Sequence, residues 1–174
     1  MPWWNTPTKR LAPPVTPERV ARVLAQWKVD HRTTADGVDL LHRYPVRIGA
    51  GSRGPTAHLL IRGLYRLDAQ GPAARLLREE VLRRSETLWF PAAWALQTAR
   101  GTQVITSHWI PTAEGLSQEQ LGDLLSKALS GLLRTLDDLG EELSLPAPPA
   151  LADATAASAI LDQFLPPVAG AGQS

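Results

Sequence analysis

The 174-residue sequence contains no cysteine. Disulfide bonds, thiol nucleophiles and thiolate metal sites are therefore excluded. The absence of cysteine does not indicate the redox compartment of the protein. The sequence also lacks any apolar run of about 18 residues, so no transmembrane helix is expected. The first fourteen residues lack the apolar stretch of a signal peptide. We expect one globular domain in the cytoplasm, with no membrane partner.

An excess of charge of either sign is also lacking, because 18 Lys and Arg are scattered among 17 Asp and Glu. Nucleic acid is not an expected partner, since phosphate backbones require a concentrated positive field. Adjacent acidic pairs occur at Glu79-Glu80 and Asp137-Asp138. Adjacent residues on a helix point about 100° apart, so these pairs do not converge for acid–base chemistry. We expect a protein that is not an enzyme.

Proline and alanine mark the two ends of the chain. Residues 1–14 hold four prolines around the pair Trp3-Trp4 and predict an N-terminal arm. Residues 15–145 are expected to form the single domain. Residues 146–174 are rich in proline and alanine and predict a tail, with a candidate short helix over 158–165.

Start signals mark the helices. Thr16 followed by Pro17 predicts an N-cap and the first residue of a helix. A second amphipathic pattern covers 71–84. Ser117 and Gln120 form a predicted capping box, and leucines at three-and-four spacing continue the pattern as a long buried helix.

Alternating patterns predict five strands. A hairpin around Asp36-Gly37 with Ala35 opposite Val38 makes His31 and His42 cross-strand neighbours. Residues 45–57 are interpreted as a glycine-rich loop, and a third strand covers 58–67. Two more strands meet at Ala99-Arg100-Gly101, with Thr98 opposite Thr102. Together these elements predict an α+β fold: an antiparallel five-stranded sheet in helix-strand-strand-strand-helix-strand-strand-helix order, with the long C-terminal helix and the first helix on one face.

Three segments resemble the YbjN family of candidate bacterial sensory transduction regulators. They are "TPERVARVLAQW" leading to "ADGVDL", "WFPAAWAL" and "GLSQEQLGDLLSKAL", and the resemblance covers about residues 15–143. It implies the type III secretion chaperone-like fold and a small, non-enzymatic, protein-binding domain that is often dimeric. The family has no agreed catalytic residues, so none is transferred. The loop at 49–54 and both tails depart from the family pattern.

Two patterns suggest a small ligand or a metal. "GAGSRG" at 49–54 fits G-x-G-x-x-G, but Pro55 and a strand follow where a nucleotide-binding motif needs a helix. The histidines on the predicted strands make a metal site conceivable. No carboxylate, however, lies at the spacing from them that a metal ligand needs. We expect no cofactor, and keep a small-ligand or metal-binding sensor as the alternative function. The four histidines are His31, His42, His58 and His108.

The aromatic residues favour a protein partner. In the predicted register, Trp89 and Trp109 lie diagonally across neighbouring strands on the face away from the main helices. Either a protein partner docks there, or the second helix or one of the tails covers this face. We expect a chaperone-like or regulatory adaptor that binds another protein or a second copy. The predicted partner-binding residues are Trp89, Ala93, Ala95, Ile105, Ser107 and Trp109.

Overall fold

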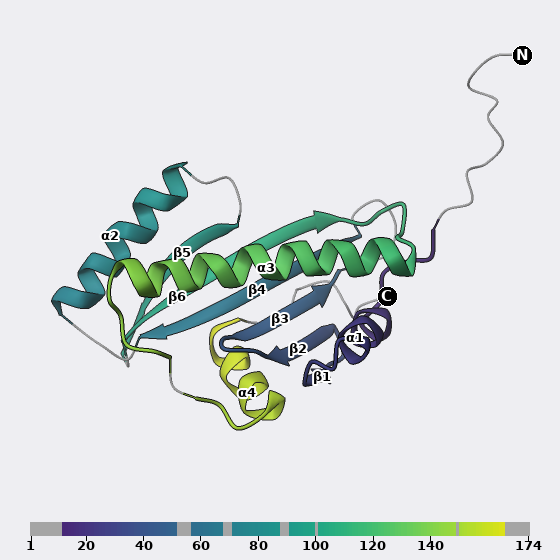
Figure 1. The fold of residues 1–174 in the computed structure, drawn as a ribbon, viewed down its shortest axis with the longest axis horizontal. Helices are drawn as coiled ribbons and strands as arrows, with labels where there is room; N and C mark the ends of the chain where they lie inside the picture. Colours follow the sequence, from purple (N-terminus) through teal and green to yellow (C-terminus); the bar gives the residue numbers. More distant parts are fainter. Residues whose placement is uncertain are drawn as a thin grey trace, which may run out of the picture.

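A six-stranded antiparallel sheet is the central layer of the protein (Figure 1). The computed structural model describes residues 12–51, 57–67, 71–87, 91–99, 101–148 and 150–165. The strand order in the sheet is β1-β2-β3-β4-β6-β5. The helices and strands are α1 (Pro17–Gln26), β1 (His31–Thr33), β2 (Gly37–Leu41), β3 (Pro45–Ala50), β4 (His58–Leu67), α2 (Pro72–Thr87), β5 (Ala92–Thr98), β6 (Gly101–Pro111), α3 (Gln118–Glu142) and α4 (Ala154–Phe164).

The predicted α+β class and antiparallel sheet are confirmed, but the expected number of strands, five, is wrong. The extra strand is β3, which lies in the segment interpreted as a loop and pairs with β2 and β4. Val46 and Ile48 of β3 are buried on one face, while Arg47 points to the other. The glycines of the same segment hid this alternation of buried side chains in the sequence. Gly37 is needed here because a Cβ atom on it would lie 2.3 Å from the backbone oxygen of Ile48.

The β1–β2 hairpin has a wider turn than predicted. Thr33, rather than Ala35, lies opposite Val38. The pairing of His31 with His42 is therefore wrong, because His31 lies opposite Leu40. A shift of two residues preserves the faces of both strands, since side chains alternate with a period of two.

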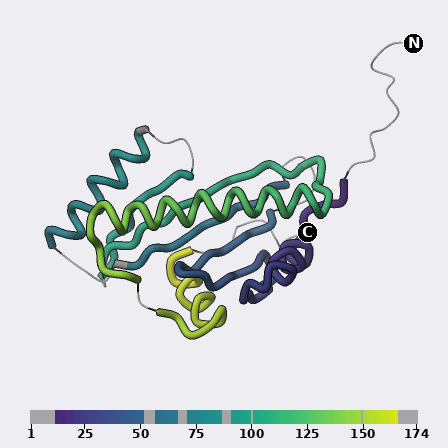
Figure 2. Tube along the Cα trace, in the orientation of Figure 1, coloured from purple at the N-terminus to yellow at the C-terminus, as the bar shows by residue number. Residues whose placement is uncertain are grey.

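The core lies between the sheet and helices α1 and α3, as predicted (Figures 1 and 2). Leucines of α3 pack on apolar side chains of β2, β3, β4 and β6. The predicted capping box at the start of α3 is present, because Ser117 Oγ accepts from Gln120 N and Gln120 Oε1 accepts from Ser117 N. Thr16 caps α1. Helix α2 packs in the same core, and its Arg84 forms an ion pair with Glu142 of α3.

Helix α4 packs on the opposite face of the sheet, over β2 and β3 (Figure 1). We call this the outer face. The helix lies within the tail predicted at 146–174, and it begins at Ala154, four residues before the helix expected there. Asp153 caps it by accepting from Ala156 N. Among the residues that the structure describes, no helix combines the length and the apolar character needed to cross a bilayer.

Candidate protein-binding surface

The pairing of β5 with β6 decides which side chains reach the outer face. Thr98 lies opposite Gly101, whereas the predicted partner was Thr102. This one-residue difference moves every β5 side chain to the other face. Trp94 and Leu96 therefore join the outer face, and Ala93 and Ala95 turn toward the helices. Two small side chains suit that position, because α2 packs directly on β5 there.

The six predicted partner-binding residues are thus divided. Ser107 and Trp109 lie on the outer face, where Ser107 is half-buried and Trp109 is exposed. Ile105 also faces outward but is only 3% exposed. Ala93 and Ala95 face the core, which corrects their predicted place on the outer face. Trp89 lies outside the described residues.

Helix α4 covers part of the outer face. Its Leu161 and Leu165 are buried against Leu64 of β4 and Ile105 of β6, and Ile160 and Phe164 flank the same cluster. The expectation that a tail could cover the patch therefore holds for Ile105. Sequence patterns did not indicate which part of the face would be covered.

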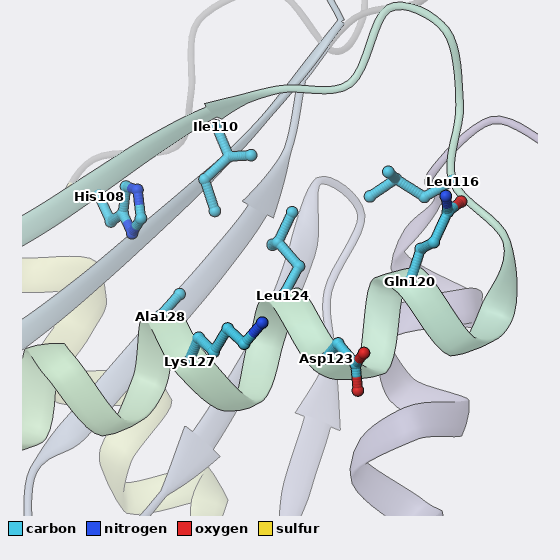
Figure 3. A pocket seen from close by; sticks show the side chains of 8 residues that line it. All are labelled: His108, Ile110, Leu116, Gln120, Asp123, Leu124, Lys127 and Ala128. Carbon is cyan, nitrogen blue, oxygen red and sulfur yellow. The ribbon is translucent and has the colours of Figure 1, made fainter.

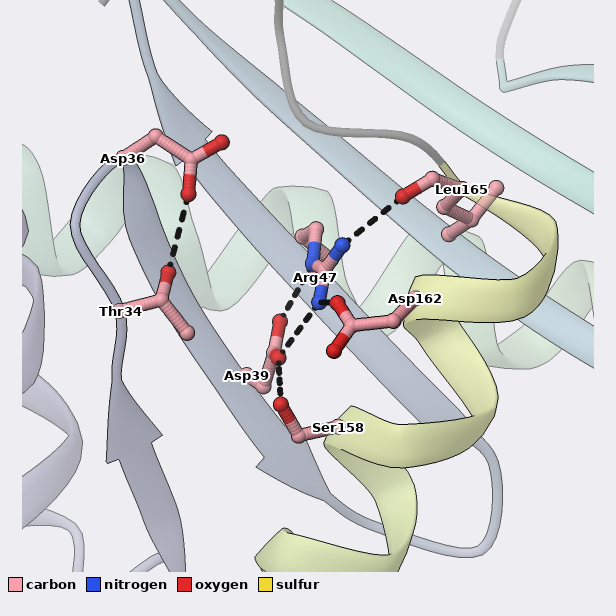
Figure 4. A network of polar contacts seen from close by, with 7 residues as sticks. All are labelled: Thr34, Asp36, Asp39, Arg47, Ser158, Asp162 and Leu165. Carbon is pink, nitrogen blue, oxygen red and sulfur yellow. Dashed lines mark hydrogen bonds and ion pairs between the residues drawn. The ribbon is translucent and has the colours of Figure 1, made fainter.

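A polar network fixes α4 on this face (Figure 4). Arg47 of β3 donates from Nε and Nη2 to both carboxylate oxygens of Asp39, at 2.7 and 2.8 Å. It also donates to Asp162 of α4 and to the backbone oxygen of Leu165. Ser158 donates to Asp39 at 2.6 Å. The hydrogen bonds from Arg47 to Asp39 raise the pKa of the guanidinium, so Arg47 keeps its charge while buried.

The uncovered part of the outer face carries large apolar side chains. Trp94, Leu96 and Trp109 are 43%, 40% and 57% exposed. Leu76 and Leu82 of α2, which packs on β5, are exposed as well. These five are all but one of the large apolar side chains exposed in the described part of the chain. We call them the β5-end patch. Trp94, Leu96 and Trp109 lie on the outer face and the two leucines of α2 on the opposite side of the sheet, and exposed apolar side chains next to a sheet edge are candidates for an interaction site.

Strand β5 is also an edge of the sheet. Its sequence, AAWALQT, has seven residues with no charge and no proline. The opposite edge, β1, has three residues and includes Arg32. Proteins usually protect edges with short strands, charges or proline, because unpaired backbone groups attract another strand. Edge β1 has such protection and β5 has none of these features.

The glycine-rich loop and the histidines do not come together. Gly49 and Ala50 belong to β3, and residues 52–54 of the motif lie outside the described residues. His58 lies near Trp109, with ring centroids 5.7 Å apart, while His108 faces α3. His31 lies in β1 and His42 follows β2. Within the described ranges, no group of three His, Cys, Asp or Glu residues could hold a metal ion.

A cavity of about 470 Å³ lies between the end of β6 and α3 (Figure 3). We call it the α3 pocket. It opens because β5 pairs with β6 only as far as Ser107, so the last residues of β6 have no described strand on that side. The polar groups of the pocket come from His108, Gln120, Asp123 and Lys127. Its apolar lining is Ile110, Leu116, Leu124 and Ala128.

Burial lowers the pKa of His108, so the folded protein disfavours the charged imidazole. The unfolded chain binds this proton more readily, and folding stability should therefore fall as the pH drops through about 6.5 toward the folded pKa. We expect His108→Gln to reduce this pH dependence. Chemical denaturation of both proteins at several values between about pH 8 and 5 measures the difference, and parallel stability curves would contradict the expectation.

The comparisons with known proteins support the fold. No protein-family model matches the chain, and no curated protein sequence matches it significantly. The crystal structure of YbjN from E. coli, described there as a candidate transcription regulator, is similar with a TM-score of 0.59. The match covers 75% of this chain and 95% of YbjN, at 9% sequence identity. The protein has a YbjN-like fold, as the sequence resemblance implied, and membership of the family by sequence is not shown.

Proposed function

We propose that this protein is a non-enzymatic protein-binding module, a regulatory or chaperone-like adaptor, and that the β5-end patch is its binding surface. The observation that carries the proposal is the pair of exposed apolar side chains, Trp94 and Leu96, on an edge strand without charge or proline. The YbjN-like fold is consistent with it, because YbjN is described as a candidate regulator.

The first partner that we propose is a second copy of the chain. An antiparallel pairing of β5 with itself, centred on Ala95, places Trp94 opposite Leu96 of the partner subunit. The same two-fold axis places Leu96 opposite the partner's Trp94. Four large apolar side chains then meet on one face, and the edges complete each other's hydrogen bonds. Such an interface is isologous and closes after two subunits.

Charge also suits this pairing. Strand β5 carries no charged side chain, so two copies meet without like charges opposed. On the other face of the same edge, Leu76 and Leu82 of α2 extend the apolar surface beyond the strand. Stable interfaces bury roughly 800 Å² on each partner, more than one strand supplies, and α2 provides additional area next to it.

The proposal is tested by the substitution Trp94→Lys. The introduced charge lies opposite the partner's Leu96 and diagonally across the axis from the same charge of the second copy, and an aromatic anchor is lost, so dimerisation should weaken at least about tenfold. Sedimentation equilibrium over a range of concentrations measures the dissociation constant. Trp27→Lys is the matched control, because Trp27 is similarly exposed, at 40%, but is the C-cap residue of α1.

We expect a dimer for the wild type and for Trp27→Lys, with Trp94→Lys shifted toward monomer. Near-UV circular dichroism checks that each variant keeps its tertiary packing. A wild type that stays monomeric up to about 100 μM would refute the second copy as partner. A dimer that is equally stable in Trp94→Lys would show that another surface mediates the contact.

A further inference from the structure

We propose that the α3 pocket binds the N-terminal arm of the same chain, with a tryptophan of the Trp3-Trp4 pair as the inserted side chain. This assigns a site and its ligand class, a tryptophan-bearing basic segment, apart from the β5-end patch. Of the predicted arm, residues 1–11 lie outside the described residues, and residues 12–14 are described.

The described chain begins at the rim of the α3 pocket. The backbone oxygen of Pro13 accepts from Leu116 N at 3.1 Å, and Leu116 lines the pocket. Arg19 donates to the oxygens of Pro13, Pro14 and Leu116 at 2.7 to 2.9 Å. These bonds fix the point from which the arm departs.

Gly115 permits this close approach. Its φ is +73°, and a Cβ atom there would lie 2.0 Å from the backbone oxygen of Ala12. No other residue type allows both the positive φ and the nearby backbone without a shift. The arm therefore leaves directly beside the pocket.

The length of the arm matches the pocket. Trp4 lies eight positions before Ala12, which gives a reach of up to about 26 Å for an extended chain. Along α3, the pocket runs from Gln120 to Ala128, a rise of about 12 Å. Trp4 can therefore reach every part of it. A volume of about 470 Å³ accommodates a large aromatic side chain in an apolar lining.

The charges of the arm complement a charge at the pocket. The arm contains Lys9 and Arg10 and no acidic residue. Asp123, which lines the pocket, is exposed on α3, and Lys127 lies one turn further along the helix. Lys9 and Arg10 precede Ala12 by three and two residues, so they can reach Asp123 when the arm docks. The indole can then enter the apolar part beyond it, and a tryptophan burial is worth more than these exposed charges.

Trypsin cleavage after Lys9 and Arg10 tests the proposal on the full-length protein. Mass spectrometry follows the loss of the first residues with time. Docking should protect the arm, so Trp3→Ala/Trp4→Ala and Leu124→Glu should each raise the cleavage rate at least about tenfold. Leu133→Glu is the matched control, because Leu133 is a half-buried leucine of α3 outside the pocket, and it should leave the rate unchanged.

A wild-type arm that is cut as fast as the arm of the tryptophan double variant would overturn the proposal. Protection that disappears on dilution would also overturn it, because it would mean that the arm docks on a second copy. The variant Trp3→Ala/Trp4→Ala changes no described core residue. It therefore still tests the proposal if Leu124→Glu fails to fold. Trp94→Lys should not alter the cleavage rate, which separates this site from the β5-end patch.

Discussion

Replacing Arg47 by alanine is expected to lower the free energy of unfolding by about 3–5 kcal/mol, because it leaves a buried carboxylate without its counter-ion. Asp39 is fully buried, and Arg47 supplies two of its hydrogen bonds. The same guanidinium holds Asp162 and the end of α4. Equilibrium unfolding in urea measures the loss.

Arg43→Ala provides the control for Arg47→Ala. Arg43 also pairs with an aspartate, Asp137, but its side chain is 53% exposed, so its loss should cost about 0–1 kcal/mol. Hydrogen exchange of α4 amides distinguishes local release of the helix from global unfolding. Equal losses for the two arginine variants would contradict the account of the buried network.

Leu132→Ala is expected to cost about 2–5 kcal/mol, because Leu132 is fully buried where α3 crosses the sheet. Gly63 of β4 lies directly beneath it, and a Cβ atom on Gly63 would lie 2.3 Å from Leu132 Cδ2. Gly63→Ala alone should therefore cost about 1–3 kcal/mol through overpacking.

The double variant Gly63→Ala/Leu132→Ala tests this packing most sharply. The alanine at 132 vacates the space that the methyl group at 63 requires. We therefore expect the double variant to lose less stability than the sum of the two single variants, by about 0.5–3 kcal/mol. Urea denaturation of all four proteins gives this coupling energy. Additive losses would show that α3 does not approach Gly63 as described.

The parts of the fold with local signals were predictable. Thr16 with Pro17, and Ser117 with Gln120, placed the starts of two helices, and both caps are observed. The leucine pattern of α3 correctly indicated its burial on the sheet. Each of these features depends on residues within a few positions of one another, so a single sequence contains all the information.

The register of β5 was not predictable in the same way. Two apolar patterns overlap in that strand, since Ala93 and Ala95 alternate with Trp94 and Leu96. A three-residue loop over Ala99-Arg100-Gly101 was preferred because it gives Gly101 the positive φ, and that choice set Thr98 opposite Thr102 instead of Gly101. The packing of α2 on the alanines decides the register, and that contact joins separate elements. The exposed tryptophan and leucine of β5 were therefore missed as candidate site residues, although Trp109 was found.

The contacts on the outer face were also not predictable from the sequence. The alternation of the predicted hairpin places Asp39 with Asp30, Arg32 and Arg43 on the charged face of a half-buried sheet. Helix α4, more than a hundred residues later, covers it, and Arg47 lies in a segment interpreted as a loop. Only the pairing of β3 between β2 and β4 brings Asp39, Arg47 and Asp162 together.

Hydrogen exchange of the β5 amides, followed as the protein concentration rises, tests the central claim most directly. The proposed pairing gives the outward-facing amides of Ala92–Thr98 new hydrogen-bond partners. We therefore predict that their exchange slows at least about tenfold between concentrations below and above the dissociation constant, while β1 at the opposite edge is unaffected. Exchange of β5 that is independent of concentration in a protein that dimerises would contradict the claim that this edge is the binding surface.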